Sequence, residues 1–331
     1  MSKILIIGAG AMGTAFSLTC VDNNHSVALI GSPLEDKLID KLNKGRRFHQ
    51  TLDCYLPKKL KLFKANKLYE TFKSKPNVVV IAVNSMGIEW IGKILSKFHN
   101  PKVPIILLTK GLTIFNKRIE PLSYKLLSII KKNQFSKFKN LSITSVAGPC
   151  IAKSLAKKKT TSVVFSNEFL ENANRHKKIF ETHYYKIECS KDYRSIQYCA
   201  AIKNFYSMII GSVSDLNTAS VIFYKSFLEM SKFIKMYGGQ EKTAYGLAGL
   251  ADLHVSSAGG RNSKMGKYLG DGYTYRKAKL KFMKHETVEG ADLAFELGPK
   301  ILNKYHKKNF PLMHSLVESI CLNKKLTLKN Y

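Results

Sequence analysis

Short runs of β-branched and aliphatic residues recur between helical stretches over residues 1–190, and this alternation limits the folds open to the chain. The runs are KILIIG, SVALIG, NVVVIAV, VPIILLT, LSITSVAG, TSVVFS and YYKIE. Several of them lack alternating polar residues, which is typical of strands that are covered on both faces. Strands that alternate with helices predict a parallel, doubly wound α/β sheet. We therefore predict an α/β domain over residues 1–190.

The glycine-rich turn GAGAMG, residues 8–13, follows the first of these runs and leads into the predicted helix TAFSLTCVDNN. Strand, glycine turn and helix in this order match the dinucleotide-binding pattern G-x-G-x-x-G. Gly8 permits the tight turn, Gly10 lets the backbone approach a pyrophosphate, and Gly13 allows close packing of the helix on the strand. The N–H groups at the start of the helix then face the anion. The motif predicts that NAD or NADP binds here.

The end of the second strand bears on the choice between the two cofactors. Proteins that bind NAD commonly have an acidic residue at this place, which binds the ribose. In this sequence the place is occupied by Gly31 and Ser32, and the first acidic residue after the strand is Glu35. A carboxylate at the strand end would repel the 2′-phosphate of NADP. Since we expect none there, we predict that NADPH is tolerated at least as well as NADH.

The pattern changes after about Asp192, where long helical candidates replace the strand runs. They are SIQYCAAIKNFYSMIIGSV, ASVIFYKSFLEMSKFIKMYG, KTAYGLAGLADLHVSS and ADLAFELGPKILNKYHK. A chain of 331 residues is long enough for two domains of common size. We therefore predict a second domain, mostly α-helical, over residues 191–331.

Lys203 interrupts the largely apolar run IQYCAAIKNFYSMIIG. On a helix it shares its face with side chains such as Ile196, Cys199 and Ile210, so that face is predicted to be buried. Burying an ammonium group without partners is costly. The lysine therefore either reaches solvent along its stem or works in a site.

Global composition excludes some classes of protein and leaves others open. The six cysteines form no CxxC pair, which argues against a zinc site and a disulfide framework. No cleavable leader and no run of about 18 apolar residues is recognisable, so we expect a cytoplasmic protein without integral membrane contact. The formal charge of +31 raises nucleic-acid binding, but the basic residues are spread along the chain. We attribute the charge to a solvated, lysine-rich surface.

A set of segments spread over the chain points to one family. In order, they are GAGAMGTAF, LLTKGL, VAGPCIAKSLAKKKTTSVVFS, CAAIKNFYSMIIG, YGLAGLADLHVSSAGGRNSKMGKYLGDG and TVEGADLA. Together they resemble the NAD(P)-dependent glycerol-3-phosphate dehydrogenases across nearly the whole chain. The resemblance implies reduction of dihydroxyacetone phosphate to sn-glycerol 3-phosphate, a precursor of glycerophospholipids. It also implies a Rossmann-type domain followed by an all-α C-terminal domain, as in 6-phosphogluconate-dehydrogenase-like proteins.

The resemblance assigns chemistry to particular residues. Hydride delivered to a ketone carbon leaves an alkoxide, so the reaction needs a proton donor. Lys203 matches the lysine of the family's KN pair, which acts as general acid in reduction and as base in oxidation, and burial lowers the pKa of a lysine toward the working range. By the same resemblance, Lys110 in TKGL polarises the carbonyl or holds the phosphate. Asp252 in LAGLADLH orients Lys203 and accepts a substrate hydroxyl.

Binding residues follow from the same match. Arg261 and Asn262 match the family's RN pair, whose guanidinium suits a phosphate monoester, and Glu289 matches a cofactor-contacting position. The predicted substrate-binding residues are Lys110, Gly148, Cys150, Asn204, Ser256, Gly260, Arg261 and Asn262. The predicted cofactor-binding residues are Gly8, Gly10, Ala11, Met12, Gly13, Ser32, Lys110, Ala152, Arg261 and Glu289. No metal site is predicted.

The chain departs from the family pattern at several of these positions. Cys150 replaces a serine near the substrate phosphate, and a thiol is a poorer hydrogen-bond donor. Met12 stands where many members carry a bulky aromatic residue. The usual TC pair is missing, so Ser256 or Ser257 supplies the hydroxyl instead. His254 is interpreted as a packing or cap residue.

Other readings of the same sequence stay open at this stage. A β-hydroxyacid or opine-type dehydrogenase of the same architecture also places a lysine or histidine on a helix of its second domain. The RN pair and LAGLADL disfavour it, because a carboxylate substrate does not need that glycine-flanked phosphate site. A basic nucleic-acid-binding protein is the remote alternative. The expected partner is the small-molecule substrate, with no specific nucleic acid, and we also expect a homodimer.

Overall fold

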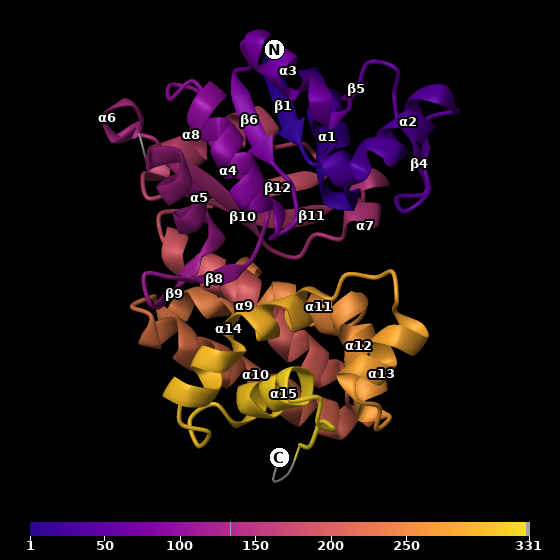
Figure 1. The fold of residues 1–331 in the computed structure, drawn as a ribbon, viewed down its shortest axis with the longest axis vertical. Helices are drawn as coiled ribbons and strands as arrows, with labels where there is room; N and C mark the ends of the chain where they lie inside the picture. Colours follow the sequence, from indigo (N-terminus) through magenta and orange to yellow (C-terminus); the bar gives the residue numbers. More distant parts are fainter. Residues whose placement is uncertain (133, 329–331) are drawn as a thin grey trace. The chain divides into compact units, whose positions relative to one another are not determined.

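The computed structural model describes residues 1–132 and 134–328. The chain forms two compact units (Figure 1). The first unit comprises residues 1–110 and 122–193, and the second comprises residues 111–121 together with the chain from Arg194 onward. The segment 111–121 therefore belongs with the helical part of the chain, although the sequence reading placed it in the domain predicted over residues 1–190.

The first unit contains a single large sheet with strand order β12-β11-β10-β7-β6-β1-β2-β5. Strand β11 pairs antiparallel with β10, and the other neighbours in this sheet pair in parallel. Each of the predicted runs forms a strand, and the short β5 was not predicted. The strands are β1 (Lys3–Ile7), β2 (Ser26–Ile30), β5 (Lys61–Phe63), β6 (Val78–Ile81), β7 (Ile105–Leu107), β10 (Ile143–Ala147), β11 (Thr161–Ser166) and β12 (Tyr185–Ser190). The predicted doubly wound α/β sheet is confirmed, with an antiparallel step between β10 and β11.

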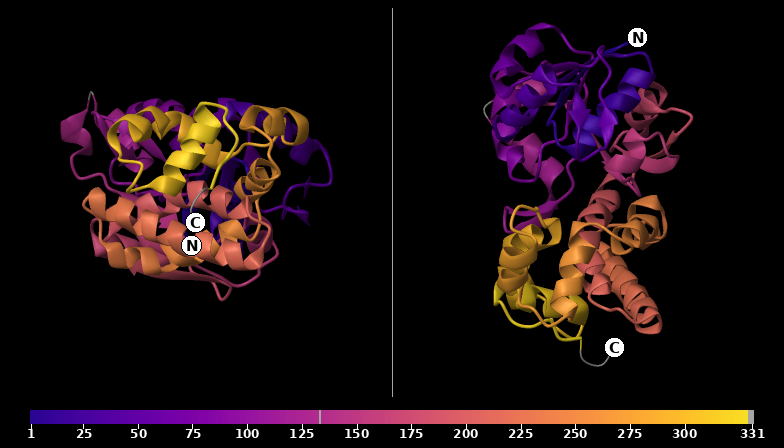
Figure 2. Two further views of the ribbon diagram at one scale, coloured as in Figure 1. Left: turned by 90° about the horizontal axis from the view of Figure 1, so that it is seen from below. Right: turned by 90° about the vertical axis from the view of Figure 1, so that its right-hand side faces the viewer.

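Helices cover both faces of this sheet (Figure 2). Alternate residues of one strand enter different cores: Ile4 and Ile6 of β1 belong to one hydrophobic cluster, and Leu5 and Ile7 belong to the other. Because both faces are covered, the four buried positions of β1 after Lys3 are all apolar, which explains the missing polar alternation in the sequence. The helical elements of this unit are α1 (Ala11–Asp22), η1 (Pro33–Glu35), α2 (Asp36–Lys44), η2 (Ala65–Lys67), α3 (Leu68–Lys73), α4 (Gly87–Phe98), α5 (Leu122–Lys131), α6 (Phe135–Phe138), α7 (Ala152–Ala156) and α8 (Leu170–Phe180). A small hairpin, β3 (Phe48–His49) with β4 (Cys54–Tyr55), follows α2.

The second unit is helical, as predicted, and the described residues from 194 to 328 include no strand. Its elements are α9 (Tyr193–Gly211), α10 (Leu216–Met236), η3 (Glu241–Tyr245), η4 (Leu247–Ala251), α11 (Asp252–Ser257), α12 (Arg261–Gly270), α13 (Tyr275–Phe282), α14 (Glu289–Lys304) and α15 (Pro311–Cys321). Helix α9 is its central element, since residues 195–210 are all buried. None of the helices in the described part of the chain is both long enough and apolar enough to cross a bilayer.

The hairpin formed by β8 (Leu112–Phe115) and β9 (Arg118–Pro121) is the part of the second unit that comes from earlier in the chain. Glu296 of α14 accepts hydrogen bonds from the Thr113 hydroxyl at 2.6 Å and from the Ile114 N–H at 3.1 Å. On the other strand, Glu120 pairs with Arg194 at 2.9 Å. Charged side chains from two helices therefore hold both strands of the hairpin to this unit.

Buried histidines predict that the first unit is sensitive to acid. The His176 ring lies 2.8 Å from the Thr144 hydroxyl oxygen, which also accepts a hydrogen bond from the Asn167 amide. Burial lowers the pKa of His176 to about 4. At pH values between about 4 and about 6.5, His176 binds a proton in the unfolded chain but not in the folded chain. The free energy of unfolding therefore falls as the pH falls through this window. Lowering the pH from about 7 to about 4.5 should therefore reduce the free energy of unfolding by about 2 kcal/mol through His176 alone.

Urea titrations at the two pH values measure this loss. His176→Gln keeps an oxygen that can accept from the Thr144 hydroxyl but does not titrate, so this variant should lose less stability than the wild type on acidification. His183→Gln replaces an exposed histidine and serves as the control. Equal acid losses in the wild type and His176→Gln would contradict the assignment.

Candidate active site

The glycine-rich turn between β1 and α1 has the close backbone approaches that its sequence predicts. Gly8 has φ +115°, and a Cβ built on it would lie 2.5 Å from the carbonyl carbon of Ala82. A Cβ on Gly13 would lie 2.0 Å from the carbonyl oxygen of Gly8. Neither position has room for a side chain, so turn and helix pack as closely as a dinucleotide-binding turn requires. Gly10 is the N-cap of α1, and no side chain caps this helix.

The residues around this turn fit a dinucleotide. Ala11 and Met12 form the first turn of α1 and are partly exposed, and Ser32 follows β2 at the same edge of the sheet. A helix N-terminus without a side-chain cap presents N–H groups and a partial positive charge to a phosphate. The turn can therefore hold the pyrophosphate of NAD or NADP.

Glu35, the first acid after β2, was not expected to reach this turn. Its Oε2 atom accepts hydrogen bonds from the N–H of Ala9 at 2.9 Å and from the N–H of Ser32 at 2.7 Å. The premise that no carboxylate lies at the end of β2 is therefore wrong, because the short helix η1 turns Glu35 back toward the strand end. Ser-x-x-Glu at residues 32–35 is a capping-box pattern, and this pattern could have revealed the bond to Ser32 but not the bond to Ala9.

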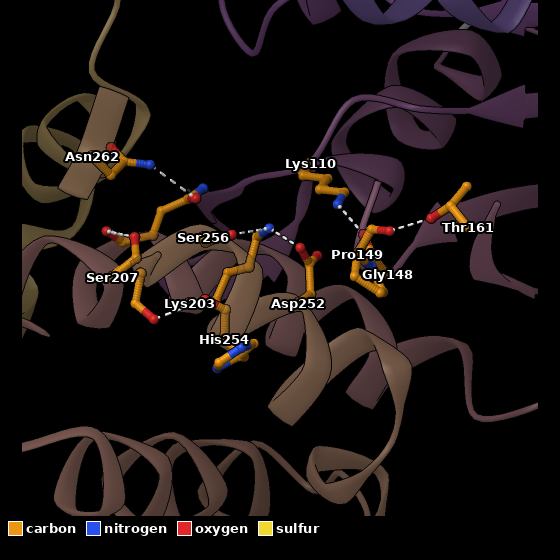
Figure 3. Close-up of polar contacts among 12 residues, drawn as sticks. Lys110, Gly148, Pro149, Thr161, Lys203, Ser207, Asp252, His254, Ser256 and Asn262 are labelled. Carbon is orange, nitrogen blue, oxygen red and sulfur yellow. Dashed lines mark hydrogen bonds and ion pairs between the residues drawn. The ribbon is translucent and has the colours of Figure 1, made fainter. Parts of the chain in front are cut away.

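Lys110 lies in the loop after β7, at the carboxyl end of the strand. Its Nζ atom lies 3.4 Å from the carbonyl oxygen of Gly148, in the loop that follows β10 (Figure 3). Gly148 has φ +125°, and the next carbonyl, that of Pro149, accepts a hydrogen bond from the Thr161 hydroxyl. Cys150 is partly buried in the same loop, just before Ala152 begins α7. The structure thus brings the predicted residues of the two loops together at one edge of the sheet.

Lys203 lies in the buried helix α9, and its side chain is only 8% exposed. Its Nζ atom forms an ion pair with the Asp252 carboxylate and donates to the Ser256 hydroxyl at 2.8 Å (Figure 3). Of the two readings that the sequence left open, a lysine that escapes to solvent is the wrong one. Between Ser256 and Ser257, it is Ser256 that contacts the lysine, since the Ser257 hydroxyl donates to the carbonyl of His254.

A π-helical turn sets the position of Asp252. The turn η4 runs over Leu247–Ala251 and leads directly into α11, which begins at Asp252. A Cβ on Gly249 would lie 2.1 Å from the carbonyl oxygen of Ala244, so only glycine permits this close packing. Single π-turns of this kind are frequent at functional sites. The glycine of LAGLADL is therefore explained by the geometry that brings the carboxylate to Lys203.

Asn204 and Asn262 are linked to each other and to the start of α14. The Asn262 amide nitrogen donates to Asn204 Oδ1 at 3.0 Å, and Asn262 Oδ1 accepts from the N–H of Gly290 at 2.9 Å. Both asparagines are buried. The neighbours of these residues in sequence are Lys203, Arg261 and Glu289, so the linkage fixes the starts of two helices relative to α9.

Arg261 and Glu289 form an ion pair at 2.9 Å, and each side chain is about half exposed. Arg261 begins α12 after Gly260, whose φ is +104°. The guanidinium is thus accessible to a phosphate, as the predicted role requires. His254 is exposed and lies against the ring of Phe223. In the described part of the chain, no group of three or more histidine, cysteine or acidic residues is placed to hold a metal.

Comparison with known families decides between the readings of the sequence. Residues 3–173 match the family model for the N-terminus of NAD-dependent glycerol-3-phosphate dehydrogenase, and residues 192–329 match the model for its C-terminus. The chain belongs to the NAD-dependent glycerol-3-phosphate dehydrogenase family. Membership of this family rules out the β-hydroxyacid, opine-type and nucleic-acid readings as the primary assignment.

Individual relatives agree with this family. An NADP(+)-dependent glycerol-3-phosphate dehydrogenase of Archaeoglobus fulgidus is 30% identical over 312 residues, covering 90% of each chain. A glycerol-3-phosphate dehydrogenase [NAD(P)+] of Clostridium botulinum is 28% identical, over 91% of this chain and 89% of its own. The crystal structure of glycerol-3-phosphate dehydrogenase from Coxiella burnetii has the same fold, with a TM-score of 0.81, 20% identity and coverage of 98% and 96%.

Proposed function

We propose that this chain is an NAD(P)-dependent sn-glycerol-3-phosphate dehydrogenase that reduces dihydroxyacetone phosphate. The observation that carries the proposal is the buried Lys203 amine, paired with Asp252 and hydrogen-bonded to Ser256. A buried amine with a carboxylate partner is a suitable proton donor for a substrate oxygen, and it stands where the family has its catalytic lysine.

When bound at the glycine-rich turn, NADH or NADPH would supply the hydride that the ketone carbon accepts. Lys203 Nζ gives a proton to the ketone oxygen, and the amine takes a proton back from solvent before the next turnover. Asp252 holds the amine in place and stabilises its charged form. Lys110 polarises the carbonyl or holds the phosphate, and Arg261 binds the phosphate through its planar fork of N–H groups. Asn262 and Ser256 complete the substrate contacts.

The decisive assay measures oxidation of NADH and of NADPH with dihydroxyacetone phosphate, and repeats it with unphosphorylated dihydroxyacetone. We expect turnover with the phosphorylated ketone and much slower turnover without the phosphate. Although Glu35 lies at the end of β2, its Oε2 atom is engaged by the N–H groups of Ala9 and Ser32, so we still expect kcat/KM with NADPH to be at least as high as with NADH. No oxidation with the phosphorylated ketone would contradict the proposed activity, whereas a strong preference for NADH would contradict the cofactor prediction alone.

Arg261→Ala should weaken use of the phosphorylated substrate. A hydrogen bond to a charged group contributes about 1.5–3 kcal/mol, so kcat/KM for dihydroxyacetone phosphate should fall about 10- to 100-fold, mainly through KM. At saturating cofactor, the rate with unphosphorylated dihydroxyacetone should change little. Arg276→Ala, at an exposed arginine of α13, is the matched control and should leave both substrates unaffected. A normal KM in Arg261→Ala would remove the guanidinium from the phosphate site.

The wider setting of the activity rests on the family resemblance. We propose that the product supplies glycerophospholipid synthesis and that the enzyme acts in the cytoplasm as a homodimer. These three statements stay predictions.

A further inference from the structure

The Glu35 carboxylate makes two bonds that serve different purposes. Its bond to the N–H of Ser32, three residues earlier, is the usual one by which a glutamate satisfies the start of its own helical turn. Its bond to the N–H of Ala9 is not explained by that role, because Ala9 lies 26 residues earlier, inside the glycine-rich turn. One carboxylate oxygen thus joins the glycine-rich turn to the end of β2.

The surrounding residues are adapted to this bridge. Gly31 leaves room for the Glu35 side chain, since a Cβ at position 31 would lie 3.2 Å from Glu35 Cβ. On the other side, Glu35 Oε1 would lie 3.3 Å from a Cβ on Gly10, so the carboxylate lies against the glycine over which a pyrophosphate is expected to pass. The backbone is tied at a second point, where the Gly8 N–H donates to the carbonyl of Ile30 at 2.8 Å.

We propose that Glu35 is a positioning residue for the dinucleotide, and that it acts by fixing the glycine-rich turn against β2 rather than by choosing between NAD and NADP. The inference deepens the proposed function, on which it rests. Because one oxygen of Glu35 satisfies two backbone N–H groups, removing the side chain leaves both N–H groups to find other partners and releases the turn. A looser turn binds the ADP-ribose part of either cofactor less well, because more of the binding energy is used to order it.

Two substitutions separate positioning from selection. Glu35→Gln retains a side-chain oxygen that can accept from both N–H groups, and it removes the charge. Glu35→Ala removes the acceptor and the charge together. If the bridge matters, Gln behaves like the wild type and Ala does not; if the charge matters because it repels a 2′-phosphate, both variants change in the same way.

The experiment is calorimetric binding of ADP-ribose and of 2′-phospho-ADP-ribose to the full-length protein. Glu35→Ala should bind both probes about tenfold more weakly or worse, with the ratio of their affinities within about threefold of the wild type. Glu35→Gln should stay within about threefold of the wild type for each probe, because its side-chain oxygen leaves neither N–H group unsatisfied. Thermal unfolding of each variant checks the fold, and Glu35→Asp, whose shorter side chain cannot reach both N–H groups, replaces Glu35→Ala if that variant does not fold.

Several results would overturn the proposal. Unchanged probe affinities in Glu35→Ala or Glu35→Asp would show that the bridge does not position the turn. A gain in affinity for 2′-phospho-ADP-ribose alone, shared by Glu35→Gln and Glu35→Ala, would make Glu35 a selector instead. Glu168→Gln, which lies outside the glycine-rich turn, controls for the loss of one negative charge. Failure of the wild-type protein to bind either probe would count against the proposed function itself.

Discussion

Lys203→Ala should lower kcat for reduction of dihydroxyacetone phosphate about a thousandfold. The reason is that the variant lacks the amine that gives a proton to the ketone oxygen, and a positioned general acid contributes about 10²- to 10⁴-fold to a rate. Affinity for NADH and NADPH should stay within about twofold of the wild type, because the lysine acts on the carbonyl and not on the dinucleotide. Steady-state rates and fluorescence titration of the cofactor measure the two quantities separately.

The control for this variant is Lys267→Ala, which removes an exposed lysine from α12 of the same unit. It should keep the wild-type rate. If Lys203→Ala retained more than about a tenth of the wild-type kcat, another group would have to donate the proton.

Asp252→Ala should destabilise the second unit strongly. The Lys203 and Asp252 side chains are 8% and 3% exposed, so the ion pair they form is shielded from water. Removing one partner of a buried pair leaves a buried charge without its counter-charge and costs about 3–5 kcal/mol. Urea unfolding, followed by the circular-dichroism signal of the helices, should show this loss. Activity should fall as well, because the amine loses the group that orients it.

A double variant separates the two effects of Asp252. Lys203→Met combined with Asp252→Leu replaces the buried pair with apolar side chains, a change that is often neutral for stability or even stabilising. This double variant should regain most of the unfolding free energy lost in Asp252→Ala but remain inactive. An Asp252→Ala protein as stable as the wild type would mean that water or another side chain already neutralises the lysine.

Hydrophobic pattern was sufficient to predict the main sheet. The runs that form β1, β2, β6 and β7 are largely apolar on both faces, and helices cover both faces in the structure, whereas β12 alternates buried apolar and exposed charged residues. The pattern did not predict that β11 runs antiparallel to β10, because strand direction depends on the path of the connections and not on composition. The hairpin β8–β9 could not be assigned to the second unit either, since Glu296 and Arg194, which hold it there, are far away in sequence.

The candidate site was predictable to the extent that its residues carry local signals. Lys203 is conspicuous as a charge on a buried helical face, and Gly8 and Gly13 follow the spacing of a known turn. Nothing local pairs Lys203 with Asp252, which lies 49 residues later; the pairing was expected only from the resemblance to the family. The contact of Glu35 with the glycine-rich turn was not predicted, because its bond to Ala9 depends on how η1 folds back, which the period of hydrophobic residues does not encode.

The proton transfer from Lys203 is tested most directly by single-turnover oxidation of bound NADH in Lys203→Ala, with and without added methylammonium. We expect very slow hydride transfer to dihydroxyacetone phosphate without the amine, and a rate that increases with methylammonium concentration as the small cation replaces the missing side chain. Hydride transfer in Lys203→Ala within about tenfold of the wild-type rate, in the absence of any added amine, would contradict it.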